Sequence, residues 1–211
     1  ESDSATASNN ADATVHVIYG QTQGVLGGAL SGYFIAMNDR TAAGPESEEW
    51  YTVGARQKGK MGGLDYRVEF YHQFGDAGVI ATTCACGVTG AIGGTASSVD
   101  RDAQMFGARI GKTFANVKGK PTLTLWYDQL SGHDDEDGAG GDFGQFNTLY
   151  DTGHKFYGFQ DFYLSNSGAN TGYYGLQDLA IKAKMTPTAG WTAKADIHFF
   201  STQTDLTGDD A

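Results

Sequence analysis

Short and long connections alternate regularly between segments of alternating hydrophobicity, and this pattern constrains the fold most. From Ala13 to Phe200 the chain contains eight such segments of about ten residues, each apolar on one face and polar on the other. Tight glycine-rich turns alternate with long acidic stretches as the connections between these segments. Membrane β-barrels have short turns on one side of the membrane and long loops on the other. The sequence therefore predicts an all-β fold, an antiparallel transmembrane β-barrel.

The composition agrees with a β-sheet protein rich in turns. Glycine accounts for 31 of the 211 residues and proline for only 3, while aromatic residues make up 12%. No run approaches the roughly 18 apolar residues of a membrane-spanning helix. The negative mean hydropathy does not argue against a barrel, because only alternate residues of a barrel strand meet lipid.

Residues 64–74 give the clearest strand pattern. Apolar side chains such as Val68 and Phe70 alternate there with charged ones such as Arg67 and Glu69. The polar face is too charged for a packed core and suits a water-filled lumen. Across the chain we expect these side chains to face lipid: Leu64, Tyr66, Val68, Phe70, Phe106, Ile110, Leu123, Leu125, Leu179, Ile181, Ile197 and Phe199.

Two other segments bear on strand orientation and register. Residues 13–19 are expected to place Val15, Val17 and Tyr19 outward, whereas residues 29–37 are apolar on both faces and leave their orientation open. A turn centred on Ala189 would place Lys182 opposite Asp196 and Lys184 opposite Lys194, all in the lumen. The parity of every apolar pair across this turn agrees with that register.

The predicted short turns lie near residues 20–28, 59–63, 115–120 and 186–190, and the long loops near 38–49, 75–102, 131–173 and beyond 202. By the rule for outer-membrane barrels the short turns are periplasmic and the long loops extracellular. All but five of the 25 acidic residues fall in the loops and the N-terminal tail. Outer-membrane lipid and lipopolysaccharide are the expected partners, and nucleic acid is not expected at so acidic a surface.

Inward-facing charged residues form the main candidate site. Rings of Arg and Lys in a narrow passage favour anions. The alternative is that each cation only neutralises a neighbouring acid as part of the scaffold. The predicted pore-lining set is Arg56, Lys58, Arg67, Glu69, Arg109, Asp128, Lys182, Lys184, Lys194 and Asp196.

Residues 143–205 resemble the C-terminal half of the alginate-export family of outer-membrane barrels. The similarity lies in FGQFNTLYDTGHKFYGFQDFYL from Phe143, in GLQDL from Gly175 and in a strand ending at His198-Phe199-Phe200. The resemblance implies a bacterial outer-membrane channel of roughly eighteen strands. It also implies that anionic solutes, including acidic polysaccharide such as alginate, pass through a lumen lined by Arg and Lys.

If the chain belongs to such a barrel, residues 1–211 form an outer-membrane β-barrel segment that is incomplete at one or both ends. We then expect the eight strands to form an open, curved sheet. The two edge strands, near Val15 and Ile197, would not pair with each other.

The long loop of residues 131–173 is a candidate constriction, because its rings could stack on sugar inside the mouth of the barrel. In the alternative, these rings pack on the barrel rim, since aromatic residues are common near membrane interfaces. The predicted constriction residues are Phe146, Tyr150, His154, Lys155, Phe156, Tyr157, Phe159 and Asp161.

Two smaller features carry residue types that bind metal ions. Asp135, Asp137 and Asp142 supply oxygen ligands of the kind that Ca²⁺ prefers, but the later bidentate Glu of a calcium loop is absent, so a solvated acidic loop is the simpler interpretation. Cys84 and Cys86 are too close for an easy mutual disulfide. They leave open a metal site or pairing with another segment.

Three function classes remain open from the sequence. The first is a transport channel, and the second is a scaffold barrel that encloses or anchors a partner protein. The third is a complete eight-stranded barrel acting as an anchor or adhesin, whose interior would be filled by side chains. No serine, histidine and acid arrangement indicates catalysis, so an enzyme is not expected.

Overall fold

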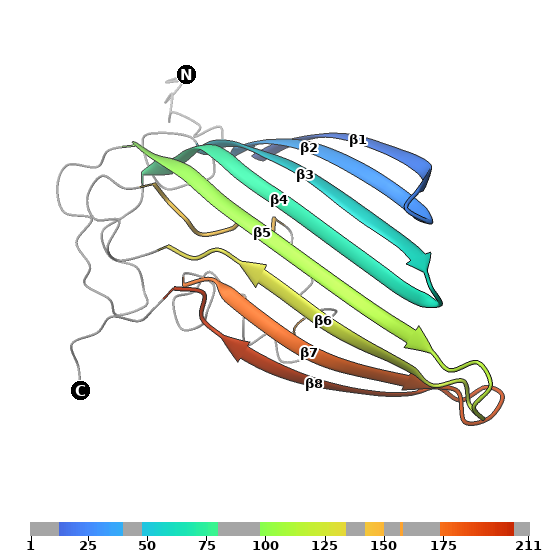
Figure 1. The fold of residues 1–211 in the computed structure, drawn as a ribbon. Helices are drawn as coiled ribbons and strands as arrows, with labels where there is room; N and C mark the ends of the chain where they lie inside the picture. The colour runs from blue at the N-terminus through green and yellow to red at the C-terminus, as the bar shows by residue number, and fades with distance from the viewer. Residues whose placement is uncertain are drawn as a thin grey trace, which may run out of the picture.

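Eight antiparallel strands form a single sheet. The computed structural model describes residues 13–39, 48–79, 98–133, 142–149, 157 and 174–204. Each strand pairs with its sequence neighbours in the order β1 to β8 (Figure 1). The strands are β1 (Ala13–Val25), β2 (Gly28–Asp39), β3 (Glu48–Met61), β4 (Leu64–Val79), β5 (Ser98–Thr113), β6 (Thr122–Leu130), β7 (Leu176–Met185) and β8 (Ala193–Ser201).

The tight turns all lie at one end of the sheet, as predicted. Leu26 and Gly27 connect β1 to β2 with φ angles of 47° and 72°, and Gly62 and Gly63 connect β3 to β4 with φ angles of 60° and 77°. Two consecutive positive φ angles are typical of a type I′ turn, whose twist matches that of the flanking strands. The longer connections, from β2 to β3, β4 to β5 and β6 to β7, belong to the opposite end.

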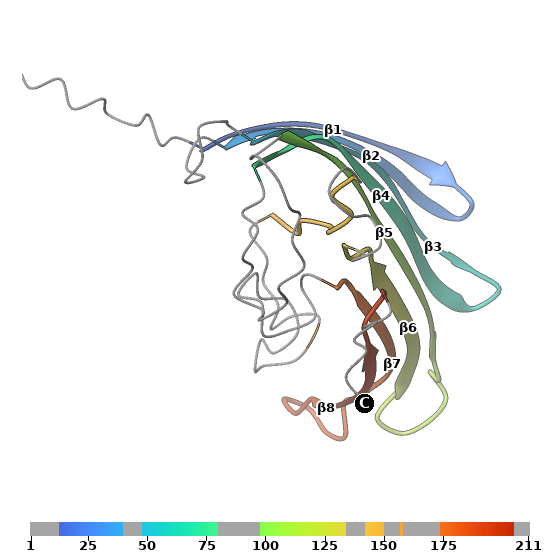
Figure 2. The same cartoon turned by 90° about the vertical axis from the view of Figure 1, so that its left-hand side faces the viewer.

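The sheet is strongly curved and encloses a concave side (Figure 2). The segment 142–149 lies on this concave side, beside the ends of β4, β5 and β6. Within the described residues β1 and β8 do not pair with each other, so the sheet is open, as expected.

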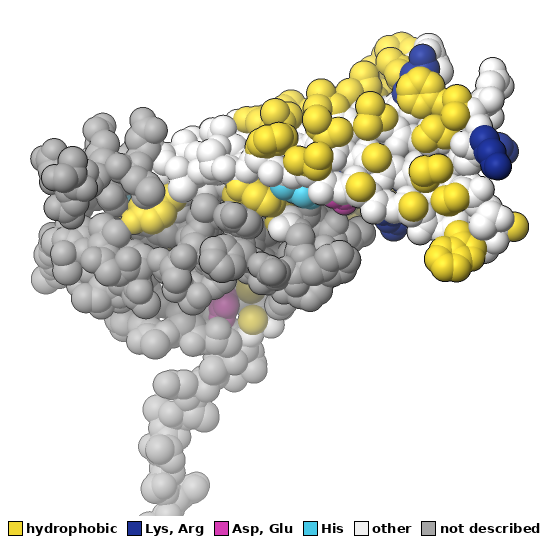
Figure 3. All heavy atoms as spheres, turned by 90° about the horizontal axis from the view of Figure 1, so that it is seen from below, with side chains coloured by type: hydrophobic (Ala, Val, Ile, Leu, Met, Phe, Trp, Pro, Cys, Tyr) yellow, Lys and Arg dark blue, Asp and Glu magenta, His cyan; other side chains and the backbone are white. Residues whose placement is uncertain are grey.

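The convex face of the sheet is apolar and exposed. Directly opposed residues in a pleated sheet point to the same face, so the register assigns the faces. Every side chain of β4 to β8 that the sequence predicted to face lipid lies on this one face. Its large exposed apolar residues include Phe34, Val53, Val68, Phe70, Phe106, Ile110, Leu123, Leu125, Leu179, Ile181, Ile197 and Phe199. Figure 3 shows hydrophobic side chains gathered over this outer side of the sheet.

The prediction for β1 is wrong. Tyr19 lies opposite Tyr33, which lies opposite Gly54 on β3, so Tyr19, Val17 and Val15 belong to the concave face. The outward residues of β1 alternate with them, as Ile18 does. Periodicity indicated the opposite orientation, because the apolar residues Val15, Val17 and Tyr19 alternate with positions that hold one large apolar residue, Ile18.

The predicted register of the last hairpin is confirmed. Lys182 lies opposite Asp196 and Lys184 opposite Lys194, as a turn centred on Ala189 requires. Among the segments that the structure describes, none forms a helix of the length and apolarity needed to cross a bilayer.

Candidate pore-lining site

A buried charge network occupies the middle of the concave face. Arg67 Nη2 lies 2.5 Å from Glu69 Oε2 on the same strand. Arg109, on the neighbouring strand, places Nη2 3.5 Å from Glu69 Oε1 and 3.3 Å from Asp128 Oδ2. Gly107 separates the two carboxylates, and a Cβ there would lie within about 3 Å of both side chains. This glycine therefore lets Arg109 reach both acids.

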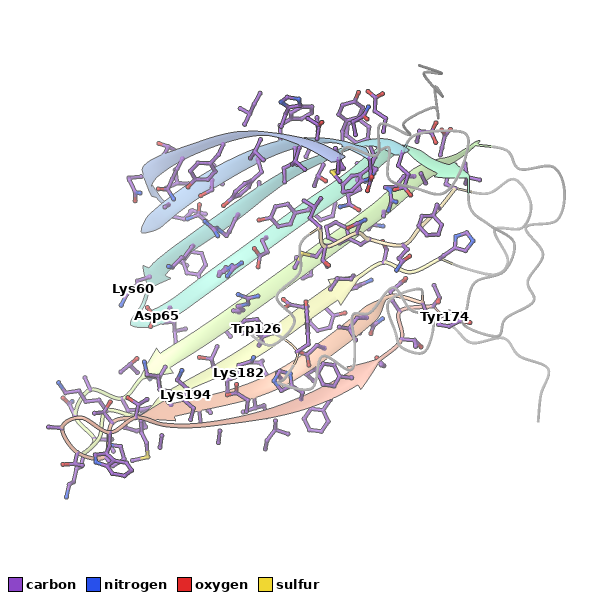
Figure 4. All side chains as sticks on the ribbon, turned by 180° about the vertical axis from the view of Figure 1, so that it is seen from behind. Lys60, Asp65, Trp126, Tyr174, Lys182 and Lys194 are labelled. Carbon is purple, nitrogen blue, oxygen red and sulfur yellow. The ribbon has the colours of Figure 1, made fainter. Side chains whose placement is uncertain are left out.

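Trp126 on β6 stabilises two cations of this face. Arg109 Cζ lies 3.2 Å from the centroid of the indole ring and Lys182 Nζ lies 4.1 Å from it. The indole Nε1 donates a 2.7 Å hydrogen bond to Asp128 Oδ2. Lys182 also lies 3.8 Å from Asp196 Oδ2. Figure 4 shows Trp126 and Lys182 on neighbouring strands, where cation–π contacts add to the ion pairs.

A third buried acid lies beside this network. Asp178 is fully buried and lies opposite Asp128 in the sheet. The side-chain Nδ1 of His198 lies 2.8 Å from Asp178 Oδ2. Sequence reasoning did not place Asp178 or His198 in the site. Asp178 and Lys182 are four residues apart on β7, so their side chains point to the same face, and this spacing is the signal that the sequence contains.

The hydroxyl of Tyr157 approaches Asp128 Oδ2 at 3.4 Å. Burial, together with the nearby charges of Asp128 and Asp178, raises the pKa of the Tyr157 phenol above its ordinary value. The phenol therefore stays protonated and donates to the carboxylate.

The predicted cations of the lumen fall into two groups. Arg67, Arg109 and Lys182 are paired with acids, as described above. The second group has no ion pair within the described ranges and consists of Arg56, Lys58, Lys184 and Lys194. Lys184 and Lys194 face each other directly.

Segment 142–149 is attached to the concave face by two buried side chains. Gln73 Nε2 donates to Asn147 O at 2.7 Å, and Asn147 N donates to Gln73 Oε1 at 2.8 Å. Arg101 Nη1 donates to Gln145 O at 2.8 Å. The Cζ atom of Arg101 lies 5.0 Å from the ring centroid of Trp50 and 5.2 Å from that of Phe143. Gln73 is 1% and Arg101 5% exposed, so both contacts are shielded from water.

Two of the predicted constriction residues are described, and both lie on the concave face. Tyr157 forms a small apolar cluster with Leu130 and Leu176, against which Phe146 packs. The other predicted constriction residues lie outside the described residues: Tyr150, His154, Lys155, Phe156, Phe159 and Asp161.

The candidate metal ligands are only partly described. Asp142 is exposed, whereas Asp135, Asp137, Cys84 and Cys86 lie outside the described residues. In the described part of the chain, no group of three or more His, Cys, Asp or Glu side chains is arranged to hold a metal ion.

A curved antiparallel sheet with an apolar convex face and a charged concave face is built like a section of a barrel wall. The chain matches the family model described as alginate export over residues 2–208. It therefore belongs to the alginate export family, whose members are outer-membrane transport porins and not enzymes. The family predicted from residues 143–205 is thus confirmed, and the match covers nearly the whole chain. No curated protein and no solved structure matches it.

Proposed function

We propose that this chain forms the wall of an outer-membrane channel that passes anionic solutes, including acidic polysaccharide such as alginate. The observation that carries the proposal is the unequal pairing of charges on the concave face. The acids there are engaged by Arg67, Arg109, Lys182 and His198. The cations without an ion pair among the described residues, with Arg56 and Lys58 among them, give the passage a net positive lining, and such a lining favours anions.

The dimensions of the convex face support a position in the outer membrane. Tyr66 and Phe74 bound the apolar part of β4 and are eight residues apart. At about 3.4 Å per residue this is about 27 Å along the strand. With a strand tilt of about 40° the distance along the barrel axis is about 21 Å, close to the apolar band of about 25 Å in outer-membrane barrels.

The two edges support a barrel larger than the eight strands. An eight-stranded barrel has an interior that is just filled by side chains. Here the concave side holds segment 142–149 as well. Among the residues that the structure describes, the outer edges of β1 and β8 pair with no other strand. Further strands would cover these edges, and a total of roughly eighteen follows the expectation from the family.

Segment 142–149, together with Tyr157, would narrow this channel from its extracellular end. Its backbone is fixed to the wall by Gln73 and Arg101, and its Phe146 packs on the cluster around Leu130. A segment fixed in this way reduces the cross-section of the passage without depending on the more distant parts of the loop.

A scaffold barrel that encloses a partner is the second candidate. It is favoured by the burial of the central network, in which Glu69 and Asp128 are almost fully buried and both lie within ion-pair distance of Arg109. Such a network holds strands together and needs no solute.

Reconstitution of the full-length protein in planar bilayers separates the two candidates. With a KCl gradient across the bilayer, a channel with this lining gives an open conductance and a reversal potential that favours chloride. A sealed bilayer, or a reversal potential that favours potassium, would contradict the proposal.

A further inference from the structure

Three tyrosine rings form a continuous row on the concave face, across the first four strands. The rings of Tyr19 on β1 and Tyr33 on β2 have centroids 5.1 Å apart. The rings of Tyr33 and Tyr71 on β4 have centroids 5.7 Å apart. Tyr19 is 52% exposed and the other two are half-buried. The row therefore presents ring surface to the space that the sheet encloses.

The row is continuous because β3 contributes a glycine at this level. Gly54 lies opposite both Tyr33 and Tyr71. A Cβ at Gly54 would lie 2.1 Å from Cδ1 of Tyr71. The absence of that Cβ allows the ring of Tyr71 to lie across β3 and reach Tyr33.

Polar groups and a cation lie along the same row. The Cζ atom of Arg56 lies 5.6 Å from the centroid of the Tyr33 ring. Gln21 Nε2 donates to Ser31 Oγ at 3.1 Å, and the Tyr19 hydroxyl lies 3.5 Å from the same Oγ. Arg56 has no ion pair within the described residues, so its charge is open to a ligand.

We propose that Tyr19, Tyr33 and Tyr71 form a binding track for an acidic saccharide, in which the rings stack on hexopyranose units and Arg56 binds a uronic acid carboxylate. The C–H bonds on the face of a pyranose carry partial positive charge and pack on the negative face of an aromatic ring. The guanidinium forms charge-assisted hydrogen bonds with a carboxylate. This inference rests on the proposed channel function and assigns a binding site within it.

The geometry of the row suits a linear chain of sugars. The separations of 5.1 and 5.7 Å between ring centroids are comparable with the length of one hexopyranose unit. Barrel strands are tilted by about 40° to the barrel axis. A row that crosses the strands therefore advances along the passage as well as around the wall.

The same strands carry a matched row of rings on the opposite face, which serves as a control. Phe34, Tyr51 and Phe74 lie on the convex face with centroids 6.0 and 5.6 Å apart. A saccharide inside the channel cannot reach them. Substitution of Tyr51 therefore tests the general effect of losing an aromatic ring from this part of the sheet.

Titration calorimetry on the full-length protein in detergent tests the track directly. The probes are a hexamer of (1→4)-linked uronic acid and a neutral hexamer of glucose. Tyr33→Leu should weaken binding of both hexamers by about twofold to tenfold, as expected for the loss of one stacking contact. Arg56→Gln should weaken binding of the uronate alone. Tyr33→Phe and the control Tyr51→Leu should bind as the unchanged protein does.

Tyr19→Leu provides a second test at an exposed position, in case Tyr33→Leu does not fold. Unchanged binding in folded Tyr33→Leu or folded Tyr19→Leu, or no binding of uronate to the unchanged protein, would overturn the track. Conductance in bilayers is measured in parallel. A protein that binds uronate but does not conduct would support the track and contradict the channel. A protein that conducts but does not bind uronate would support the channel and contradict the track.

Discussion

Gln73 and Asn147, which are 74 positions apart in the sequence, are joined by two hydrogen bonds of 2.7 and 2.8 Å between the side-chain amide of Gln73 and the backbone of Asn147. A side-chain amide carries donor and acceptor groups in the same plane. Gln73 thus pairs with Asn147 much as a neighbouring strand would, and it fixes segment 142–149 to the wall at one point.

Replacement of Gln73 by Ala should widen the passage. Two buried hydrogen bonds are lost at about 1 kcal/mol each, and the backbone groups of Asn147 lose their partners. We expect a higher single-channel conductance and faster protease cleavage within 142–149. Gln129→Ala, on the convex face, is the matched control, and an equal conductance in both variants would contradict the constriction.

Loss of one member of the central network should destabilise the wall. Arg109→Gln leaves the carboxylates of Glu69 and Asp128 buried with fewer partners. We expect the free energy of unfolding in urea to fall by about 3–5 kcal/mol, the usual cost of an uncompensated buried charge. The double variant of Arg109→Gln with Asp128→Asn should regain part of this loss. Additive losses would mean that the two side chains act independently.

The cations without an ion pair in the described residues should set the selectivity. A variant with Arg56, Lys58, Lys184 and Lys194 all changed to Gln should shift the reversal potential toward cations. The effect should be smaller at high salt, because the screening length falls from about 10 Å at 0.1 M to about 3 Å at 1 M. The variant Lys182→Gln with Asp196→Asn removes a neutral pair and should leave the potential unchanged. A shift of equal size in that variant would argue against the division of the cations into two groups.

Charge on the convex face should destabilise the protein according to depth. Phe70 lies near the middle of the apolar part of β4, whereas Leu64 lies beside the tight turn. Phe70→Arg should cost about 2–4 kcal/mol in the free energy of unfolding from lipid vesicles. Leu64→Arg should cost about 0–1 kcal/mol, since a long side chain near the interface reaches water. Equal costs at the two positions would argue against a bilayer around this face.

The sequence predicted the strands best where one face is clearly polar. The alternation around Val68 and the turn centred on Ala189 gave the correct faces and register, because each depends only on neighbouring residues. The predicted orientation of β1 was wrong, because its apolar residues Val15, Val17 and Tyr19 line the concave face instead of the lipid-facing one. Ion pairing among Glu69, Arg109 and Asp128 could not be predicted, because the register of β5 depends on a long connection.

Two features of the concave face have no periodic pattern in the sequence: the attachment of segment 142–149 and the row of tyrosine rings. Segment 142–149 has no strand or helix periodicity, so nothing in its sequence indicates that Gln73 and Arg101 hold it. The row formed by Tyr19, Tyr33 and Tyr71 was also hidden, since it requires the correct orientation of β1 and the gap at Gly54.

Strands that pair only with their neighbours in the sequence can be added to a sheet one hairpin at a time. The order β1 to β8 contains no crossover, and local pairings have a low entropic cost of closure. Segment 142–149 is different, because it binds residues of β4 and β5 as well as Ser131 after β6. It can dock only after those three strands are in place. If this segment narrows the passage as proposed, the passage is wide while the wall assembles and becomes narrow as a late step of folding.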